Sequence, residues 1–156
     1  MGLTGVVGID IRPGPNVTIL ASADYLPFRS ESFQLIFAGE VLEHLSDPAR
    51  AITDWVRVLK KDGRMVISTP NGLRVSVTGG HPEHKRMFAP NDLNRTLQRL
   101  GMTAVHTTGI FIALVSGRRL FRRIPFEALK IALLRFPVPV SLSHDVFISA
   151  QKTSKT

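Results

Sequence analysis

The sequence predicts an α/β fold, in which a mostly parallel sheet alternates with helices. Short apolar runs rich in β-branched residues occupy 4–11, 17–21 and 33–38, and each is followed by polar or turn-forming residues, as is typical of strands. Apolar residues then recur at helical spacing over 48–59 and 91–100. Strands that alternate with helices form βαβ units, so the pattern favours parallel pairing.

The first three predicted strands have clear ends. The run 4–11 (TGVVGIDI) carries Asp10 near its end. The prolines and glycine of 12–15 (RPGP) prevent the strand from continuing. Residues 33–38 (FQLIFA) are almost wholly apolar. Such a run predicts a strand covered on both faces, as in a parallel sheet that lies between helices.

The later elements follow from capping residues and spacing. Asp47 is placed to cap a helix and Pro48 to occupy its first turn, with Asp62-Gly63 closing the element. Strands are expected over 64–69, within 102–115 and over 145–151.

Length and composition indicate one globular domain. The 156 residues fit a single domain over 1–156, and 44% apolar with 21% charged residues is typical of a folded chain. No cysteine is present, which excludes disulfides and thiolate metal sites. These features favour a cytoplasmic protein. Peripheral association with a membrane is compatible with this expectation.

The chain is strongly basic, with a net charge of +8 and a pI near 10.8. Such a balance favours anionic partners, although a solvated basic surface is the simpler interpretation. Arginines alternate with apolar residues over 116–140, which predicts a helical insertion before the last strand. This insertion could pack on the core, cover a substrate pocket, or lie on an anionic membrane surface through 116–136.

Four polar residues follow the ends of predicted strands: Asp10, Asp24, Glu40 and Asn71. In open α/β sheets, ligands bind beyond the carboxyl ends of the strands. These residues therefore mark the edge of the sheet where a site is expected.

Three segments in this order carry a family resemblance: "GIDI", "ASADYLPFRSESFQLIFAGEVLEHLSDP" and "VLKKDGRMVISTPN". Together they resemble the class I S-adenosylmethionine-dependent methyltransferases of the small-molecule type. The resemblance is close over 4–71 and looser through "HPEHKRMFAPNDL". It implies a Rossmann-like sheet, S-adenosylmethionine as cofactor, and methyl transfer to a small-molecule or lipid-linked acceptor.

The resemblance also implies roles for single residues in cofactor binding. Asp10, with its neighbour Ile11, would bind the ribose hydroxyls, since a carboxylate can accept from two donors. Asp24 would meet the adenine amino group, Tyr25 would offer its backbone N–H, and Leu26 would pack on the ring. The alternative for both aspartates is a capping or turn role.

Glu40, Glu43 and His44 would share one face if residues 40–44 were helical. They could be structural and solvent-facing, or they could shape the acceptor pocket, with His44 as general base beside Glu40. A third interpretation is a divalent metal site for Mg²⁺, Mn²⁺ or Zn²⁺. In the metal-assisted branch of the family the matching ligands would be Glu40, Glu43, His44 and His84, with His81 as an alternative to the last.

One part of the family pattern is missing. The first strand of the family and its glycine-rich loop should precede Thr4, and Gly2, Gly5 and Gly8 do not replace them, because such a loop follows a strand and opens a helix. We therefore expect an N-terminally truncated domain with two exposed pairing edges, which a partner chain could complete.

Two alternatives to an active small-molecule enzyme remain open. One is a catalytically incomplete remnant or subunit. The other is an RNA methyltransferase, which would explain the basic charge; nucleic acid is the less favoured partner because no aromatic stacking platform is evident.

Overall fold

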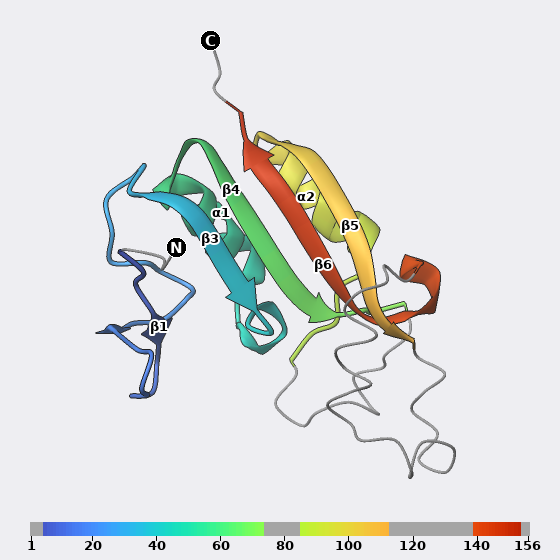
Figure 1. Ribbon diagram of the computed structural model, residues 1–156, viewed down its shortest axis with the longest axis horizontal. Helices are drawn as coiled ribbons and strands as arrows, with labels where there is room; N and C mark the ends of the chain where they lie inside the picture. The colour runs from blue at the N-terminus through green and yellow to red at the C-terminus, as the bar shows by residue number, and fades with distance from the viewer. Residues whose placement is uncertain (1–4, 74–84, 113–138, 154–156) are drawn as a thin grey trace.

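The computed structural model describes residues 5–73, 85–112 and 139–153 (Figure 1). Its main sheet has four strands in the order β3 (Phe33–Gly39), β4 (Leu59–Pro70), β6 (Ser143–Lys152) and β5 (Met102–Ile112). β3 pairs parallel with β4, and β6 lies antiparallel to both β4 and β5. Three of the four strands thus run in one direction and β6 opposes them, which confirms the α/β prediction.

The N-terminal strands form a separate two-stranded sheet. β1 (Ile9–Asp10) pairs parallel with β2 (Ile19–Leu20), so the predicted strands over 4–11 and 17–21 shorten to two residues each. β3 ends the larger sheet, and among the described strands none joins the two sheets. A strand with one short neighbour has few ladder hydrogen bonds, which explains the shortening.

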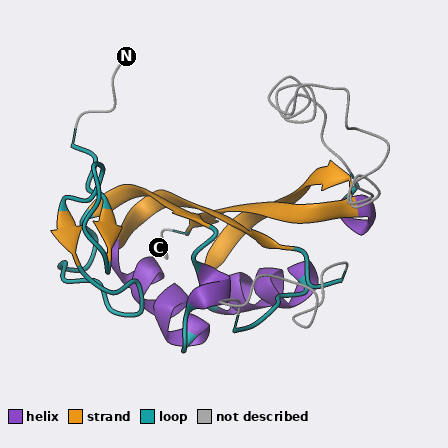
Figure 2. Cartoon of the chain, turned by 90° about the horizontal axis from the view of Figure 1, so that it is seen from below, coloured by secondary structure: helices purple, strands orange, loops and turns teal. Residues whose placement is uncertain are grey.

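Both long helices cover the same face of the main sheet (Figure 2). α1 (Pro48–Val58) begins as predicted, because the Asp47 carboxylate accepts a hydrogen bond of 3.0 Å from the Arg50 backbone N–H. α2 (Pro90–Arg99) also starts with a proline, and Gly101 follows it with a φ of +81°. Two short 3₁₀ helices complete the described elements, η1 (Leu42–His44) and η4 (Val140–Leu142).

The passage from α1 to β4 differs from the prediction. The helix gives way to extended backbone at Leu59, with φ −75° and ψ 132°, and no separate loop intervenes. The pairing with β3 then shifts between Phe33–Leu59 and Leu35–Arg64, and Asp62 has a φ of 58°. The predicted turn at Asp62-Gly63 is therefore an irregularity inside β4, with Leu59 before it and residues 64–68 after it paired to β3.

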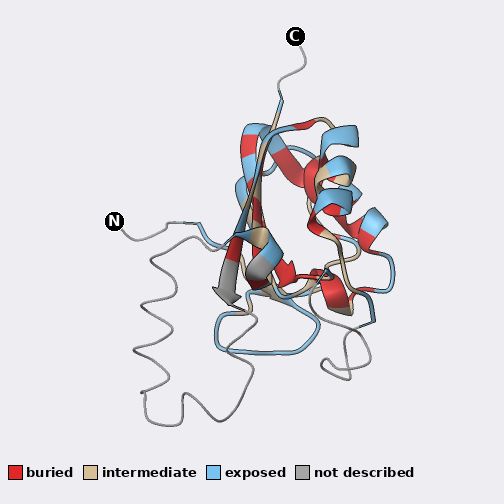
Figure 3. Cartoon of the chain, turned by 90° about the vertical axis from the view of Figure 1, so that its right-hand side faces the viewer, coloured by how far each residue is buried: buried red, intermediate tan, exposed pale blue. Residues whose placement is uncertain are grey.

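The hydrophobic core lies between the main sheet and the two helices (Figure 3). The helices contribute Ile52, Trp55 and Leu97, and the sheet contributes Ile67 and Ile148, all at most 2% exposed. Burial of this kind stabilises a domain by roughly 25 cal/mol for each Å² of apolar surface.

The opposite face of β3 is open, which corrects the expectation that this strand is covered on both faces. Leu35 is 52% exposed and Phe37 is 64% exposed. The physical reason is that α1 and α2 lie on one side of the sheet, and no described helix lies on the other (Figure 2).

The predicted helical insertion over 116–140 falls between β5 and β6. Its residues 116–138, and with them the whole proposed membrane-facing segment 116–136, lie outside the described residues. In the described part of the chain, no helix is long and apolar enough to cross a membrane.

Two leucines test the one-sided core. Leu97 is 1% exposed and Leu35 is 52% exposed. We expect Leu97→Ala to lower the free energy of unfolding by about 2–5 kcal/mol, because it leaves a cavity. Leu35→Ala should change it by about 0.5 kcal/mol or less. Urea unfolding measures both, and equal losses would contradict a core confined to the helical face.

Candidate functional site

The carboxyl end of β1 carries the first predicted site residue. Asp10 is exposed, and its Oδ1 accepts a hydrogen bond of 2.8 Å from the Arg12 backbone N–H. Ile11 beside it is 71% exposed. The turn-capping contact is thus present, and the exposed position leaves the carboxylate accessible to a ligand.

Asp24 lies in the loop that follows β2, and one of its oxygens has no partner. Its Oδ2 accepts from the Ser22 hydroxyl at 3.3 Å, and the Ser22 Oγ accepts in turn from the Asp24 backbone N–H at 3.2 Å. Oδ1 is buried and makes no hydrogen bond within the structure. A buried acceptor left unpaired costs about 1–3 kcal/mol, so a hydrogen-bond donor placed at this atom would stabilise the loop.

The next two residues are placed differently from the roles that the resemblance implied. The Tyr25 backbone N–H donates to the Ser22 carbonyl oxygen at 3.3 Å, in a turn. Its ring is 62% exposed and lies 5.6 Å from the Arg50 guanidinium, a cation–π distance. The Leu26 side chain is 7% exposed and packs in the core. The exposed group of this pair is the tyrosine ring.

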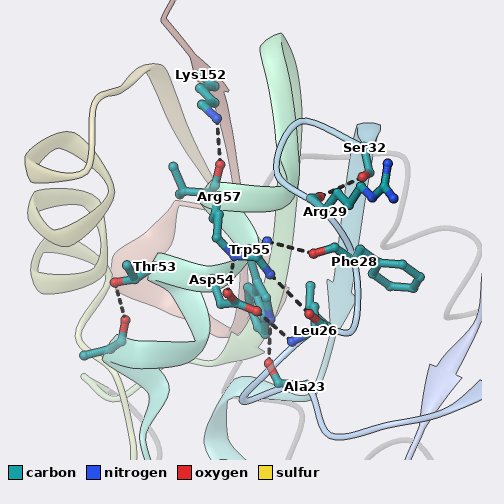
Figure 4. A network of polar contacts seen from close by, with 12 residues as sticks. Ala23, Leu26, Phe28, Arg29, Ser32, Thr53, Asp54, Trp55, Arg57 and Lys152 are labelled. Carbon is teal, nitrogen blue, oxygen red and sulfur yellow. Dashed lines mark hydrogen bonds and ion pairs between the residues drawn. The ribbon is translucent and has the colours of Figure 1, made fainter.

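Helix α1 holds this loop through polar contacts that sequence analysis did not identify (Figure 4). The Asp54 carboxylate accepts from the Leu26 backbone N–H and from Arg57 Nε, both at 2.6 Å. Trp55 Nε1 donates to the Ala23 carbonyl oxygen at 2.8 Å. An aspartate and an arginine three residues apart predict an ordinary surface ion pair on a helix, so only the packed structure shows what they bind.

Glu40 follows β3 in a strained conformation. Its φ is 51°, in the left-handed region that residues with a side chain seldom adopt. Its backbone N–H donates to the Ser68 carbonyl oxygen at 3.1 Å and to the Ser68 hydroxyl at 3.2 Å, and that hydroxyl donates to Glu40 Oε1 at 2.7 Å. Non-glycine residues held in this region concentrate at functional sites.

Glu43 is fully buried, at 0% exposure, and is the most perturbed acid of the site. The Thr69 hydroxyl donates to its Oε2 at 3.1 Å, while Oε1 is buried without a partner. Burial raises the pKa of Glu43 from 4.5 to about 7; the nearby charge of Glu40 adds to the rise, and hydrogen bonds from its own backbone N–H and from Thr69 oppose it.

The three residues of the predicted helical face are not on one helix. Glu43 and His44 belong to the three-residue η1, whereas Glu40 precedes it and is bound to Ser68. His44 is half-buried, and its backbone N–H donates to the Val41 carbonyl oxygen at 3.1 Å. Residues 40–44 are thus not one helix: Glu40 has left-handed backbone, and a short 3₁₀ turn follows it.

The predicted metal set is not assembled in the described residues. No three histidine, aspartate or glutamate side chains of this part of the chain are grouped so as to hold a metal ion. His81 and His84 lie outside it. The chain is described again from Lys85, whose backbone N–H donates to the Glu43 carbonyl oxygen at 2.9 Å. The end of the predicted histidine loop therefore reaches η1.

Asn71, the fourth polar residue of the predicted edge, has a structural role. It is 0% exposed, and its Nδ2 donates to the carbonyl oxygens of Val140 and Ser143 at 2.7 and 3.0 Å. Its Oδ1 accepts from the Leu73 backbone N–H at 3.1 Å. The amide thus ties the end of β4 to η4 and to the start of β6.

Residues 5–67 match the model of a family described as "Methyltransferase domain". A solved S-adenosylmethionine-dependent methyltransferase from Archaeoglobus fulgidus superposes with a TM-score of 0.67 at 17% identity, over 94% of this chain and 75% of that one. Residues 5–67 are thus similar to methyltransferases in sequence, and the chain shares the fold of a solved one. The superposition confirms the predicted Rossmann-like fold, and the family match supports the predicted family.

Two curated methyltransferases are similar to this chain in sequence. A probable S-adenosylmethionine-dependent methyltransferase of Mycobacterium tuberculosis is 32% identical over 101 residues, which is 62% of this chain and 37% of the relative. A ubiquinone biosynthesis O-methyltransferase of Agrobacterium fabrum is 26% identical over 112 residues, 62% of this chain and 44% of the relative. The chain thus spans less than half the length of these relatives.

The buried carboxyl of Glu43 predicts a pH dependence of stability. Its pKa is raised from 4.5 to about 7 in the folded chain, so the folded state binds the proton more tightly than the unfolded state. The free energy of unfolding should therefore fall as the pH rises from about 4.5 through 7, by on the order of 3 kcal/mol. Glu43→Gln cannot titrate and should remove this decline.

Urea unfolding between pH 4.5 and 8 measures the effect. The matched control is Asp92→Asn, because the Asp92 carboxylate on α2 is 71% exposed. The control should keep the decline of the wild-type chain. If Glu43→Gln and the wild-type chain show parallel pH profiles, the raised pKa is wrong.

Proposed function

We propose that this chain binds S-adenosylmethionine and takes part in transfer of its methyl group to a small-molecule or lipid-linked acceptor. The observation that carries the proposal is the buried, unpartnered Oδ1 of Asp24, in the loop after β2. An oxygen of this kind fits the exocyclic amino group of an adenine, which supplies an N–H donor. The match of residues 5–67 to the methyltransferase family model and the shared fold support the same cofactor.

The proposed cofactor contacts divide between two loops at the carboxyl ends of β1 and β2. The exposed Asp10 carboxylate would accept from the ribose hydroxyls, with Ile11 beside the sugar. Asp24 would accept from the adenine amino group. The exposed Tyr25 ring, backed by Arg50, offers an apolar face to the base, in place of the Leu26 side chain that is buried in the core.

The acceptor side of the site follows β3, where Glu40 and η1 lie. When bound, S-adenosylmethionine supplies an electrophilic methyl group on a sulfonium. The chain would then have to align the acceptor atom with that methyl and remove a proton from it. We assign removal of this proton to the His44 imidazole. The carboxylate of Glu40, whose backbone is strained, would orient the acceptor. Glu43 is fully buried, so it supports this turn from behind and does not touch the substrate.

Two features bear on the acceptor and the metal. The similarity to a ubiquinone biosynthesis O-methyltransferase favours an apolar, hydroxyl-bearing acceptor over RNA. The metal site that the resemblance implied stays a prediction, because His81 and His84 lie outside the described residues. A subunit that completes its site with another chain remains the rival of a self-sufficient enzyme, and cofactor binding by the isolated chain separates the two.

Calorimetric titration with S-adenosylhomocysteine, the product form of the cofactor, tests the proposal. The wild-type chain should bind it, and Asp24→Asn should weaken binding about tenfold, because a charged acceptor is replaced by a neutral one. Asp92→Asn, which removes an exposed carboxylate on α2, should bind like the wild-type chain. A folded wild-type chain that takes up no S-adenosylhomocysteine would contradict the proposal for this chain.

A further inference from the structure

We propose that Asp54 and Arg57 of α1 are positioning residues for the cofactor: together they hold the loop of residues 22–28 so that the Asp24 carboxylate meets the adenine. The inference rests on the proposed function and extends it to residues that touch no part of the cofactor. We call Asp54, Trp55 and Arg57, with their contacts to residues 23–28, the α1 latch (Figure 4).

The latch binds the loop backbone at four points. Asp54 Oδ2 accepts from the Leu26 backbone N–H at 2.6 Å. Arg57 donates to the carbonyl oxygens of Phe28 and Leu26, at 2.7 and 3.1 Å. Trp55 Nε1 donates to the Ala23 carbonyl oxygen at 2.8 Å. The bonds on Ala23 and Leu26 flank Asp24 and Tyr25, so they fix the backbone on both sides of the proposed adenine contact.

Asp54 and Arg57 also depend on each other. Arg57 Nε donates to Asp54 Oδ1 at 2.6 Å, so one carboxylate oxygen binds the arginine and the other binds the loop. Burial opposes the charge of Asp54, but the hydrogen bonds from Arg57 and Leu26 outweigh it and hold the pKa of Asp54 below its usual value. Loss of either partner would leave the other without its compensating charge.

These contacts do more than stabilise α1, because they also join it to a distant loop. Asp54 is 9% exposed, and the loop bonds of the pair join residues 28 to 31 positions apart in the sequence. The chain contains a matched pair without this feature, Asp92 and Arg95 on α2. They have the same i, i+3 spacing and a contact of 3.2 Å, but both side chains are at least 67% exposed.

The test compares two ligands that differ at the adenine amino group, S-adenosylhomocysteine and S-inosylhomocysteine, in which a carbonyl oxygen replaces that group. The wild-type chain should bind the first about tenfold more tightly than the second, because only the first donates to Asp24. In Asp54→Asn this ratio should fall toward one, since the carboxylate is no longer held in place. A merely destabilised protein would lose affinity for both ligands equally and keep the ratio. Asp92→Asn should behave like the wild-type chain.

A spectroscopic readout reports the loop directly. Trp55 is the only tryptophan of the chain, and it is bonded to Ala23. Opening of the latch in Asp54→Asn should red-shift its emission and raise its quenching by acrylamide at least twofold, whereas Asp92→Asn should change neither. Should Asp54→Asn fail to fold, Arg57→Lys serves as the second variant, because an ammonium cannot reproduce the planar guanidinium contacts to Asp54 and two carbonyl oxygens.

The outcomes separate the two proposals. If the wild-type chain binds neither ligand, the proposed function fails, and Trp55 quenching alone decides whether the latch controls the loop. Wild-type binding with an unchanged ligand ratio in both variants would overturn the latch while leaving the proposed function intact. Unchanged quenching in both variants would also overturn it. A collapsed ratio together with raised quenching, confined to the α1 variants, supports it.

Discussion

The Asp54 carboxylate is the constraint on which the arrangement of the described chain depends. β1 and β2 pair with each other and with no described strand of the main sheet, so backbone pairing does not join the two sheets. The link is made by residues 22–32, which α1 holds through its side chains and through its last carbonyl oxygens. The backbone N–H groups of Glu31 and Ser32 donate to the carbonyl oxygens of Arg57 and Val58, at 3.0 and 2.8 Å. A buried carboxylate bonded to both arginine and backbone is among the stronger polar contacts of a protein. One helix thus bridges the core and the proposed cofactor loops.

The proposed acceptor side is held differently, by hydroxyl and amide groups at the end of β4 and just after it. Ser68 binds Glu40, Thr69 binds Glu43, and Asn71 ties the same strand to η4 and β6. Two hydroxyls near the end of β4 and the amide just after it therefore fix both carboxylates and the returning chain. Because β4 is paired on both sides, it is a rigid base for the strained backbone of Glu40. The proposed reaction would need such rigidity, since methyl transfer depends on alignment.

Local signals in the sequence were sufficient for the elements, and insufficient for the contacts between them. The Asp47 cap and the proline after it are local chemistry, so the start of α1 was predictable. The open face of β3 was not, because an apolar run is the same whether or not a helix covers it. Asn71 was expected at the site and proves structural, since its partners lie about 70 residues away. Asp54 and Arg57 were overlooked for the same reason: their spacing is that of a surface pair, and their loop partners are distant in sequence.

Two buried carboxylate oxygens in the described residues have no hydrogen-bond partner, Asp24 Oδ1 and Glu43 Oε1. The cost of leaving them unpaired can be relieved in different ways. Glu43 has a carboxylate neighbour and a pKa raised to about 7, so uptake of a proton removes most of its cost. Asp24 has instead a hydroxyl donor in Ser22, in a loop whose backbone bonds are already fixed by α1. An added N–H donor from outside the chain would satisfy its free oxygen without any rearrangement of the loop backbone. The same physical defect therefore favours uptake of a proton at Glu43, and it fits the proposed ligand contact at Asp24.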